Sequence, residues 1–213
     1  MNILVLLEGD EEELLFDLFK PHVHSLINLS YINVKGFGNI PVYFQSHITN
    51  DYYDAVLCVY DVDNKVNISD SPYNIVRNNL RKILNTESRV SDISFCTNPN
   101  ILQFLLLGAD TLENVSLTST SKKANTPILN RYWPKLGNKK EYSAASWQLD
   151  IIRNDYEYGN SSIANMINNA KQLPLDYKRN LPGSNLNKLL LALSEGNLEF
   201  FNKAIKAINI ERK

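Results

Sequence analysis

Short apolar runs alternate with amphipathic stretches along the first half of the chain. Aliphatic runs that end at polar or glycine residues are typical of strands buried in a parallel sheet. The runs predict strands over 3–7, 29–34, 55–60 and 93–96. Apolar residues at helical spacing between and after them predict helices over 10–20, 40–47, 72–84 and 101–107. This alternation indicates an α/β domain, in which helices flank a parallel four-stranded sheet.

The second half has a different pattern, and the change comes near Leu112. Pro127, Pro134 and Gly137 interrupt any regular element between 114 and 140. Apolar stripes beyond this segment predict helices over 144–153, 161–173, 184–193 and 198–210. We therefore expect an α/β domain over 1–112 and, over 113–213, a basic loop and a helical extension packed on that domain.

Composition adds little to this picture. The 213 residues are 44% hydrophobic and 21% charged, as in a folded protein with a real core. The net charge of −1 gives no global attraction to nucleic acid or to a membrane, so any polyanion site must be local. Cys58 and Cys96 lie in strand-like runs, which favours buried reduced thiols over a disulfide. No apolar run approaches the roughly 18 residues of a membrane span, and we expect a cytoplasmic protein.

Acidic residues follow the first and third predicted strands. Glu8 and Gly9 come directly after the first, and Asp61 and Asp63 come after the third. Ligands of open α/β sheets bind beyond the carboxyl ends of the strands, so we expect the three carboxylates to meet in one crevice. They would repel one another without a cation, and oxygen ligands with room for water suit Mg²⁺ or Mn²⁺. The sequence therefore predicts a metal site.

Glu-Gly after a first strand and Asp-x-Asp after a third resemble the TOPRIM fold. This fold is the metal-binding catalytic module of topoisomerases, primases, small ribonucleases and OLD-type nucleases. The resemblance implies that Glu8 is the general acid or base and that Asp61 and Asp63 hold the metal. It also implies that Glu12 or Glu13 matches a second acidic residue that nuclease-type members carry after the Glu-Gly step.

A closer resemblance involves two further segments. Residues 98–107 resemble the Asn-Pro-x-x-Glu-x-Trp-Leu-Leu segment of RloB-like and related abortive-infection proteins, which are often encoded beside an ATPase. Residues 182–189 are similar to the Pro-x-Ser/Thr-x-Val-x-x-Leu segment of that family. One departure is Leu102, which stands where the family has Glu. This leaves one-metal or weakened catalysis open.

The implied chemistry needs few groups. A divalent ion would neutralise a phosphodiester and lower the pKa of a bound water. Glu8 would then move a proton, and Lys65, two residues after Asp63, is a candidate for contacting a phosphate oxygen. Gly9 would let the backbone turn tightly and leave room for that phosphate. A simpler interpretation is that these Asp and Gly residues are ordinary turns after strands.

The basic segment is a candidate nucleic-acid surface, because it combines positive charge with Tyr132 and Trp133. An equally weighted alternative is a solvated loop whose aromatic side chains pack into the core. The candidate ligands of a nucleic-acid backbone are Lys122, Lys123, Arg131, Lys135, Lys139 and Lys140.

The leading hypothesis is a Mg²⁺-dependent TOPRIM-type nuclease that cleaves DNA or RNA in an anti-phage abortive-infection system. Its expected partners are nucleic acid and a companion AAA/ABC-type ATPase, with no membrane, and a homodimer is one candidate assembly. Leu102 motivates an alternative, a non-catalytic TOPRIM-like regulatory partner. A receiver-like domain with Asp61 as phosphoacceptor is less favoured, because that family needs a Lys after a fifth strand and none is evident beyond Leu107.

Overall fold

The computed structural model describes residues 1–62, 69–98, 100–115, 122–134, 136, 146–173 and 183–209. Its centre is one sheet with the strand order β2-β1-β3-β4-β5. The strands are β1 (Asn2–Leu7), β2 (Asn28–Asn33), β3 (Ala55–Asp61), β4 (Ser94–Asn98) and β5 (Gly183–Ser184). The first four pair in parallel, and β5 runs antiparallel to β4. The predicted parallel sheet is confirmed, but five strands rather than four make up its described part.

The central strands are hydrophobic without alternation because helices cover both faces of the sheet. Every residue from Ile3 to Leu7 and from Ala55 to Tyr60 is at most 1% exposed. Strand β2 lies at one edge of the sheet, and most of its residues are only partly buried. The core is therefore centred on β1 and β3.

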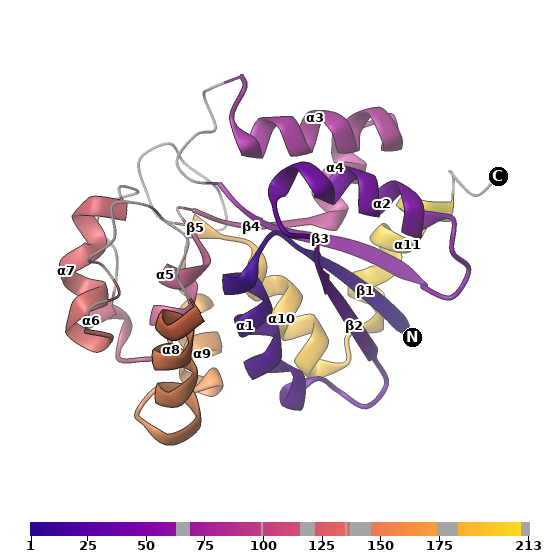
Figure 1. Cartoon of the computed structure of the whole chain (residues 1–213). Helices are drawn as coiled ribbons and strands as arrows, with labels where there is room; N and C mark the ends of the chain where they lie inside the picture. Colours follow the sequence, from indigo (N-terminus) through magenta and orange to yellow (C-terminus); the bar gives the residue numbers. More distant parts are fainter. Residues whose placement is uncertain are drawn as a thin grey trace.

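The helices of the first half alternate with the strands. They are α1 (Asp10–Phe19), η1 (Lys20–His22), η2 (Phe37–Asn39), α2 (Ile40–Ile48), α3 (Pro72–Leu84), α4 (Glu87–Ile93) and α5 (Ile101–Leu106). Helix α1 packs on one face of the sheet, and α2 and α3 lie on the other (Figure 1). The sequence analysis missed α4, which has only seven residues and buries just Val90 and Ile93.

The second half is mostly helical, as predicted. Its helices are α6 (Leu112–Val115), α7 (Lys122–Tyr132), α8 (Ser146–Tyr158), α9 (Ile163–Ala170), α10 (Leu186–Glu195), η4 (Leu198–Phe201) and α11 (Asn202–Asn209). The prediction of a loop was wrong for residues 122–132, because α7 continues through Pro127. Helix α10 contacts β4, and α11 contacts β3 and α4, so the last helices cover the sheet. Helices α5 to α9 gather beyond the carboxyl ends of the strands, on the left of Figure 1.

Two further sequence predictions concern thiols and membranes. Cys58 and Cys96 are buried and free, as expected, and burial raises the pKa of the Cys58 thiol. Within the described ranges, no helix has both the length and the apolar character that crossing a membrane requires.

Candidate metal centre at the carboxyl edge of the sheet

The strand order creates a crevice between the ends of β1 and β3. From β1 the chain crosses through α1 to β2 on one side, and then returns through α2 to β3 on the other side. Helices α1 and α2 consequently lie on opposite faces (Figure 1). The carboxyl ends of two such neighbouring strands form a topological switch point, where ligands of open α/β sheets bind.

Glu8 lies at this switch point, directly after β1. Its backbone N–H donates to the carbonyl oxygen of Val59 at 3.1 Å, which continues the pairing of β1 with β3. Its carboxylate Oε2 accepts a hydrogen bond of 3.0 Å from the backbone N–H of Asp61. Both acidic residues are half-buried. The structure therefore brings together Glu8 and Asp61, which lie 53 residues apart in the sequence.

Glu12 adds a third carboxyl group next to this pair. It is 3% exposed, and its Oε2 accepts the backbone N–H of Gly9 at 2.9 Å, which caps the start of α1. Burial, and then the negative charges of Glu8 and Glu11, hold the pKa of Glu12 well above its usual range. The carboxyl groups of Glu8 and Glu12 therefore lie close enough to influence each other.

The chain bends at Glu8 and Gly9, between β1 and α1, as predicted. The φ of −156° and ψ of −165° at Gly9 are extended and open to any residue, so this bend does not require glycine. A Cβ at this position would lie 3.4 Å from Glu12 Oε2, which is ordinary contact. Gly9 is therefore the N-cap residue of α1 in an unstrained conformation.

The two segments that resemble the abortive-infection proteins are neighbours in the fold. Asn98 ends β4 and pairs with Gly183 of β5. Ser184 is 1% exposed, and its Oγ lies 3.0 Å from both Thr97 Oγ1 and the carbonyl oxygen of Cys96. It also accepts the backbone N–H of Leu186 at 3.1 Å. These contacts give Ser184 a structural role, since they fasten the start of α10 to β4.

Two buried amides at the start of α5 were missed by the sequence analysis. Asn100 is 3% exposed and Gln103 is 5% exposed, and their side-chain oxygens accept no hydrogen bond within the described structure. Buried polar atoms are normally paired, so such oxygens are uncommon. Gln103 follows Leu102, the position of the family's Glu, and α5 packs against α1. The only sequence signal was a pair of polar residues in an apolar segment.

A lysine at the rim was also missed. Lys35, after β2, places its Nζ 2.6 Å from Asp10 Oδ1, and Asn33 Nδ2 donates to the same oxygen at 2.7 Å. The hydrogen bond from Lys35 is the main reason why the pKa of Asp10 is lowered. Because both side chains are largely exposed, this pair contributes little to stability. It does place one cation at the edge of the acidic region.

The remaining predicted site residues are only partly covered. Asp63 and Lys65 lie outside the described residues, as do Lys135, Lys139 and Lys140. Lys122 and Lys123 begin α7, and Arg131 is exposed near its end.

The aromatic residues of the basic segment do not form a stacking platform. Trp133 is 0% exposed, and its Nε1 donates to Asp155 Oδ2 at 3.0 Å. Tyr132 donates its hydroxyl to Asp110 Oδ2 at 2.8 Å. The alternative in which aromatic side chains pack into the core is therefore correct for Trp133.

The side chains that the structure brings together at this edge are carboxylates, whose oxygens suit a hard divalent cation. Among the described residues, no three His, Cys, Asp or Glu side chains are arranged to hold a metal ion, and Asp63 lies outside that part. No family model matches this chain, and comparisons with curated proteins and with solved structures find no similar protein.

Proposed function

We propose that Glu8 and Asp61 belong to a Mg²⁺ or Mn²⁺ site that supports hydrolysis of phosphodiester bonds in DNA or RNA. The observation that supports this most is the hydrogen bond of 3.0 Å from the Asp61 N–H to the Glu8 carboxylate, at the switch point of the sheet. The raised pKa of Glu12 supports it in part: burial raises this pKa most, and repulsion from the carboxylates of Glu8 and Glu11 raises it further. A cation would relieve this repulsion.

The residues of the site would have different roles in the reaction. A bound divalent ion supplies charge neutralisation at the phosphate and a more acidic water. Asp61 and Asp63 would hold the ion together with an oxygen of Glu8, and Glu8, oriented by the end of β3, would also hold or move a proton near the scissile bond. Glu12, whose Oε2 accepts the Gly9 N–H, would keep the start of α1 in place beside the ion, and Lys65 would contact a phosphate oxygen.

Nucleic acid would reach this edge along α7. Arg131 is exposed on that helix, and α7 contacts α5, which begins at the end of β4. Basic side chains that follow a phosphate backbone supply most of the affinity of such surfaces. The proposal assigns the other five predicted basic residues to the same surface. It also includes two partners, a companion ATPase and a second copy of this chain.

A non-catalytic regulatory partner is the second candidate function. Leu102 is 8% exposed among apolar neighbours, and it supplies no carboxylate where the resembling family has one. The receiver-like alternative receives less support. Strand β5 is antiparallel, so the next lysine, Lys188, lies toward the amino end of β4 and far from Asp61 in the sheet.

The direct test is cleavage of plasmid DNA, single-stranded DNA and tRNA by the purified chain with Mg²⁺ or Mn²⁺. We expect Glu8→Gln to lower the rate roughly 10²–10⁴-fold, as for loss of a general acid or base. Asp61→Asn should abolish metal-dependent cleavage. The matched control is Asp150→Asn, an exposed carboxylate on α8 that should leave the rate unchanged.

The two candidate functions give different results in this experiment. Cleavage that survives in Asp61→Asn would contradict the nuclease proposal. Saturable Mn²⁺ binding without cleavage of any substrate would instead support the non-catalytic partner. Absence of both binding and cleavage would contradict both functions at this site.

A further inference from the structure

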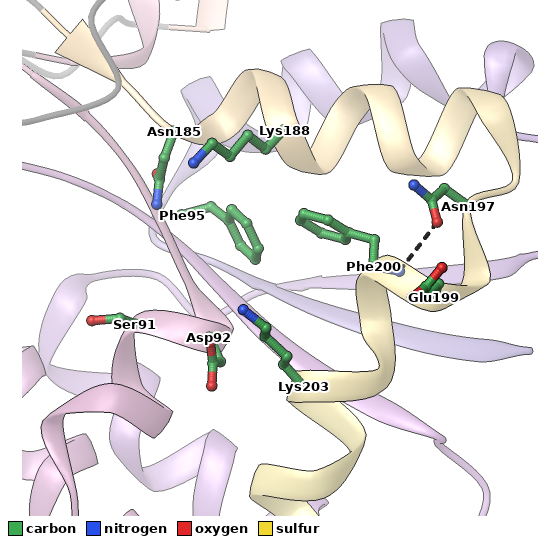
Figure 2. A pocket seen from close by; sticks show the side chains of 9 residues that line it. All are labelled: Ser91, Asp92, Phe95, Asn185, Lys188, Asn197, Glu199, Phe200 and Lys203. Atoms are coloured by element: carbon green, nitrogen blue, oxygen red, sulfur yellow. Dashed lines mark hydrogen bonds between the residues drawn. The ribbon is translucent and has the colours of Figure 1, made fainter.

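A second site lies at the opposite edge of the sheet, near the amino end of β4. A cavity of about 390 Å³ opens there between α4, β4, the start of α10, η4 and α11. Figure 2 shows the nine residues that line it. Strand β5 runs antiparallel to β4, and this reversal delivers Asn185 and α10 to the amino edge. The cavity shares no residue with the carboxyl-edge site.

Two phenylalanines form an apolar wall in this cavity. Phe95 of β4 is 4% exposed, and Phe200 of η4 is partly exposed. Their ring centroids are 5.9 Å apart at an interplanar angle of 36°, and Phe201 supports Phe200 edge-on at 5.1 Å. Asn197 fixes the backbone of Phe200, because its Oδ1 accepts the Phe200 N–H at 3.2 Å (Figure 2). A held, partly exposed ring of this kind suits stacking by a planar ligand.

Two lysines from different elements line the same cavity. Lys188 comes from the first turn of α10 and extends toward Asn185, and Lys203 comes from the first turn of α11 and extends toward Phe95 (Figure 2). Both residues are exposed, and neither takes part in an ion pair within the described structure. The cavity thus has two ammonium groups beside its apolar wall, together with the carboxylates of Asp92 and Glu199, which suits a ligand that carries both an anionic group and hydrogen-bond donors.

The start of α10 adds positive potential. Its N-cap residue, Asn185, does not cap the helix with its side chain. The Asn185 amide instead accepts the Cys96 N–H at 2.7 Å and donates to the Ser94 carbonyl at 3.0 Å, so it ties the helix to β4. The N–H groups of Leu186 and Lys188 already donate to Ser184 Oγ and Asn187 Oδ1, so the helix contributes its dipole, and not free N–H groups, beside the Lys188 ammonium.

We propose that this cavity binds a nucleoside monophosphate, with the base stacked on Phe200 and the phosphate between Lys188 and Lys203. A phosphate monoester carries about −1.5 to −2 charge at pH 7, which matches two ammonium groups. Asp92 and Glu199 also line the cavity, and their carboxylates can accept hydrogen bonds from amino groups of the base or from ribose hydroxyls. The volume lies at the small end of the range for ligand sites, about 300–1,000 Å³.

The test is calorimetric titration of the full chain with AMP, GMP, CMP and UMP, and separately with adenosine and inorganic phosphate. We expect saturable binding of at least one monophosphate, and binding of adenosine and phosphate at least about tenfold weaker, since each supplies half of the contacts. Lys188→Gln and Lys203→Gln should each weaken binding roughly tenfold. Phe200→Leu should weaken it roughly 5- to 100-fold.

Two controls make the result specific. Lys171→Gln removes an exposed lysine at the end of α9, away from the cavity, and should bind the nucleotide like the unmodified chain. Glu8→Gln should also leave nucleotide binding unchanged, because the inference does not depend on the proposed nuclease site.

Two outcomes would overturn this inference. One is no saturable binding of any monophosphate at millimolar concentration. The other is unchanged affinity in the double variant of Lys188 and Lys203, both of which are exposed, so that its folding is not in question.

Discussion

The two edges of the sheet each carry the start of a helix, but the first turns of these helices differ in charge. At the carboxyl edge, α1 begins with Asp10, Glu11, Glu12 and Glu13. At the amino edge, α10 has Lys188 in its first turn and no acidic residue. Acidic side chains offset the positive end of a helix, and a lysine adds to it. The same local geometry is therefore suited to a cation at one edge and to an anion at the other.

The edges also differ in how they are enclosed. Helices α5 to α9 gather beyond the carboxyl edge (Figure 1), whereas the amino-edge cavity is lined by exposed lysines. The difference shows the effect of one short strand. Because β5 has two residues and runs against β4, the chain reverses there and begins α10 at the edge where parallel strands start.

The largest expected effect concerns the enclosure of the carboxyl edge. Trp133→Ala should lower the free energy of unfolding by about 3–5 kcal/mol, because it removes a fully buried indole and its hydrogen bond to Asp155. Trp147→Ala is the matched control, since this indole is 47% exposed and should matter far less. Urea denaturation of both variants measures this. Equal losses in the two variants would contradict the described packing of α7 and α8.

A smaller effect concerns the charge at the start of α1. The pKa of Glu12 is raised in the folded chain, so the folded chain holds the proton of Glu12 more tightly than the unfolded chain does. This difference stabilises the folded chain below the unfolded-state pKa, and the stabilisation is lost as pH rises through the folded-state pKa. Glu12→Gln removes this titration. We expect the stability of Glu12→Gln relative to the unmodified chain to increase as pH rises above about 4.3, the usual pKa of Glu.

Denaturation curves across this pH range measure the trend, and Glu157→Gln is the control, as an exposed glutamate of α8. A stability difference between Glu12→Gln and the unmodified chain that does not change with pH would contradict a raised pKa of Glu12 in the folded chain, whether from burial or from the charges of Glu8 and Glu11.

The smallest effect concerns the backbone at the same helix start. Gly9 is extended and a Cβ would meet only Glu12 Oε2 at 3.4 Å, so Gly9→Ala should cost no more than about 1 kcal/mol, as for a changed N-cap residue. Thermal unfolding followed by circular dichroism would measure this. A loss of several kcal/mol would mean that the position needs glycine, as the TOPRIM resemblance implied.

The sequence was informative where local pattern decides structure. The apolar runs identified β1 and β3, whose full burial removes any alternation, and residues 72–84 were predicted with the bounds that α3 has. Glu8 and Asp61 could be predicted as neighbours because parallel strands align their carboxyl ends.

The sequence was uninformative where distant segments decide it. Strand β5 is too short to have a pattern, and it exists only because Thr97 and Ser184 pair across 87 residues. The amino-edge cavity could not be predicted from the sequence for the same reason, because residues after 184 form it together with β4. Trp133 lies in a basic segment and Trp147 in an apolar one, yet Trp133 is buried and Trp147 is 47% exposed, because distant contacts decide their burial.

The most direct test of the central claim is a crystal structure of the chain soaked in Mn²⁺, with the ion located by anomalous scattering. The account predicts one ion at the carboxyl edge, with oxygens of Glu8 and Asp61 at about 2.0–2.6 Å, the range of oxygen ligands around Mg²⁺ and Ca²⁺. An ion bound elsewhere, with no density between these two carboxylates at saturating Mn²⁺, would contradict it.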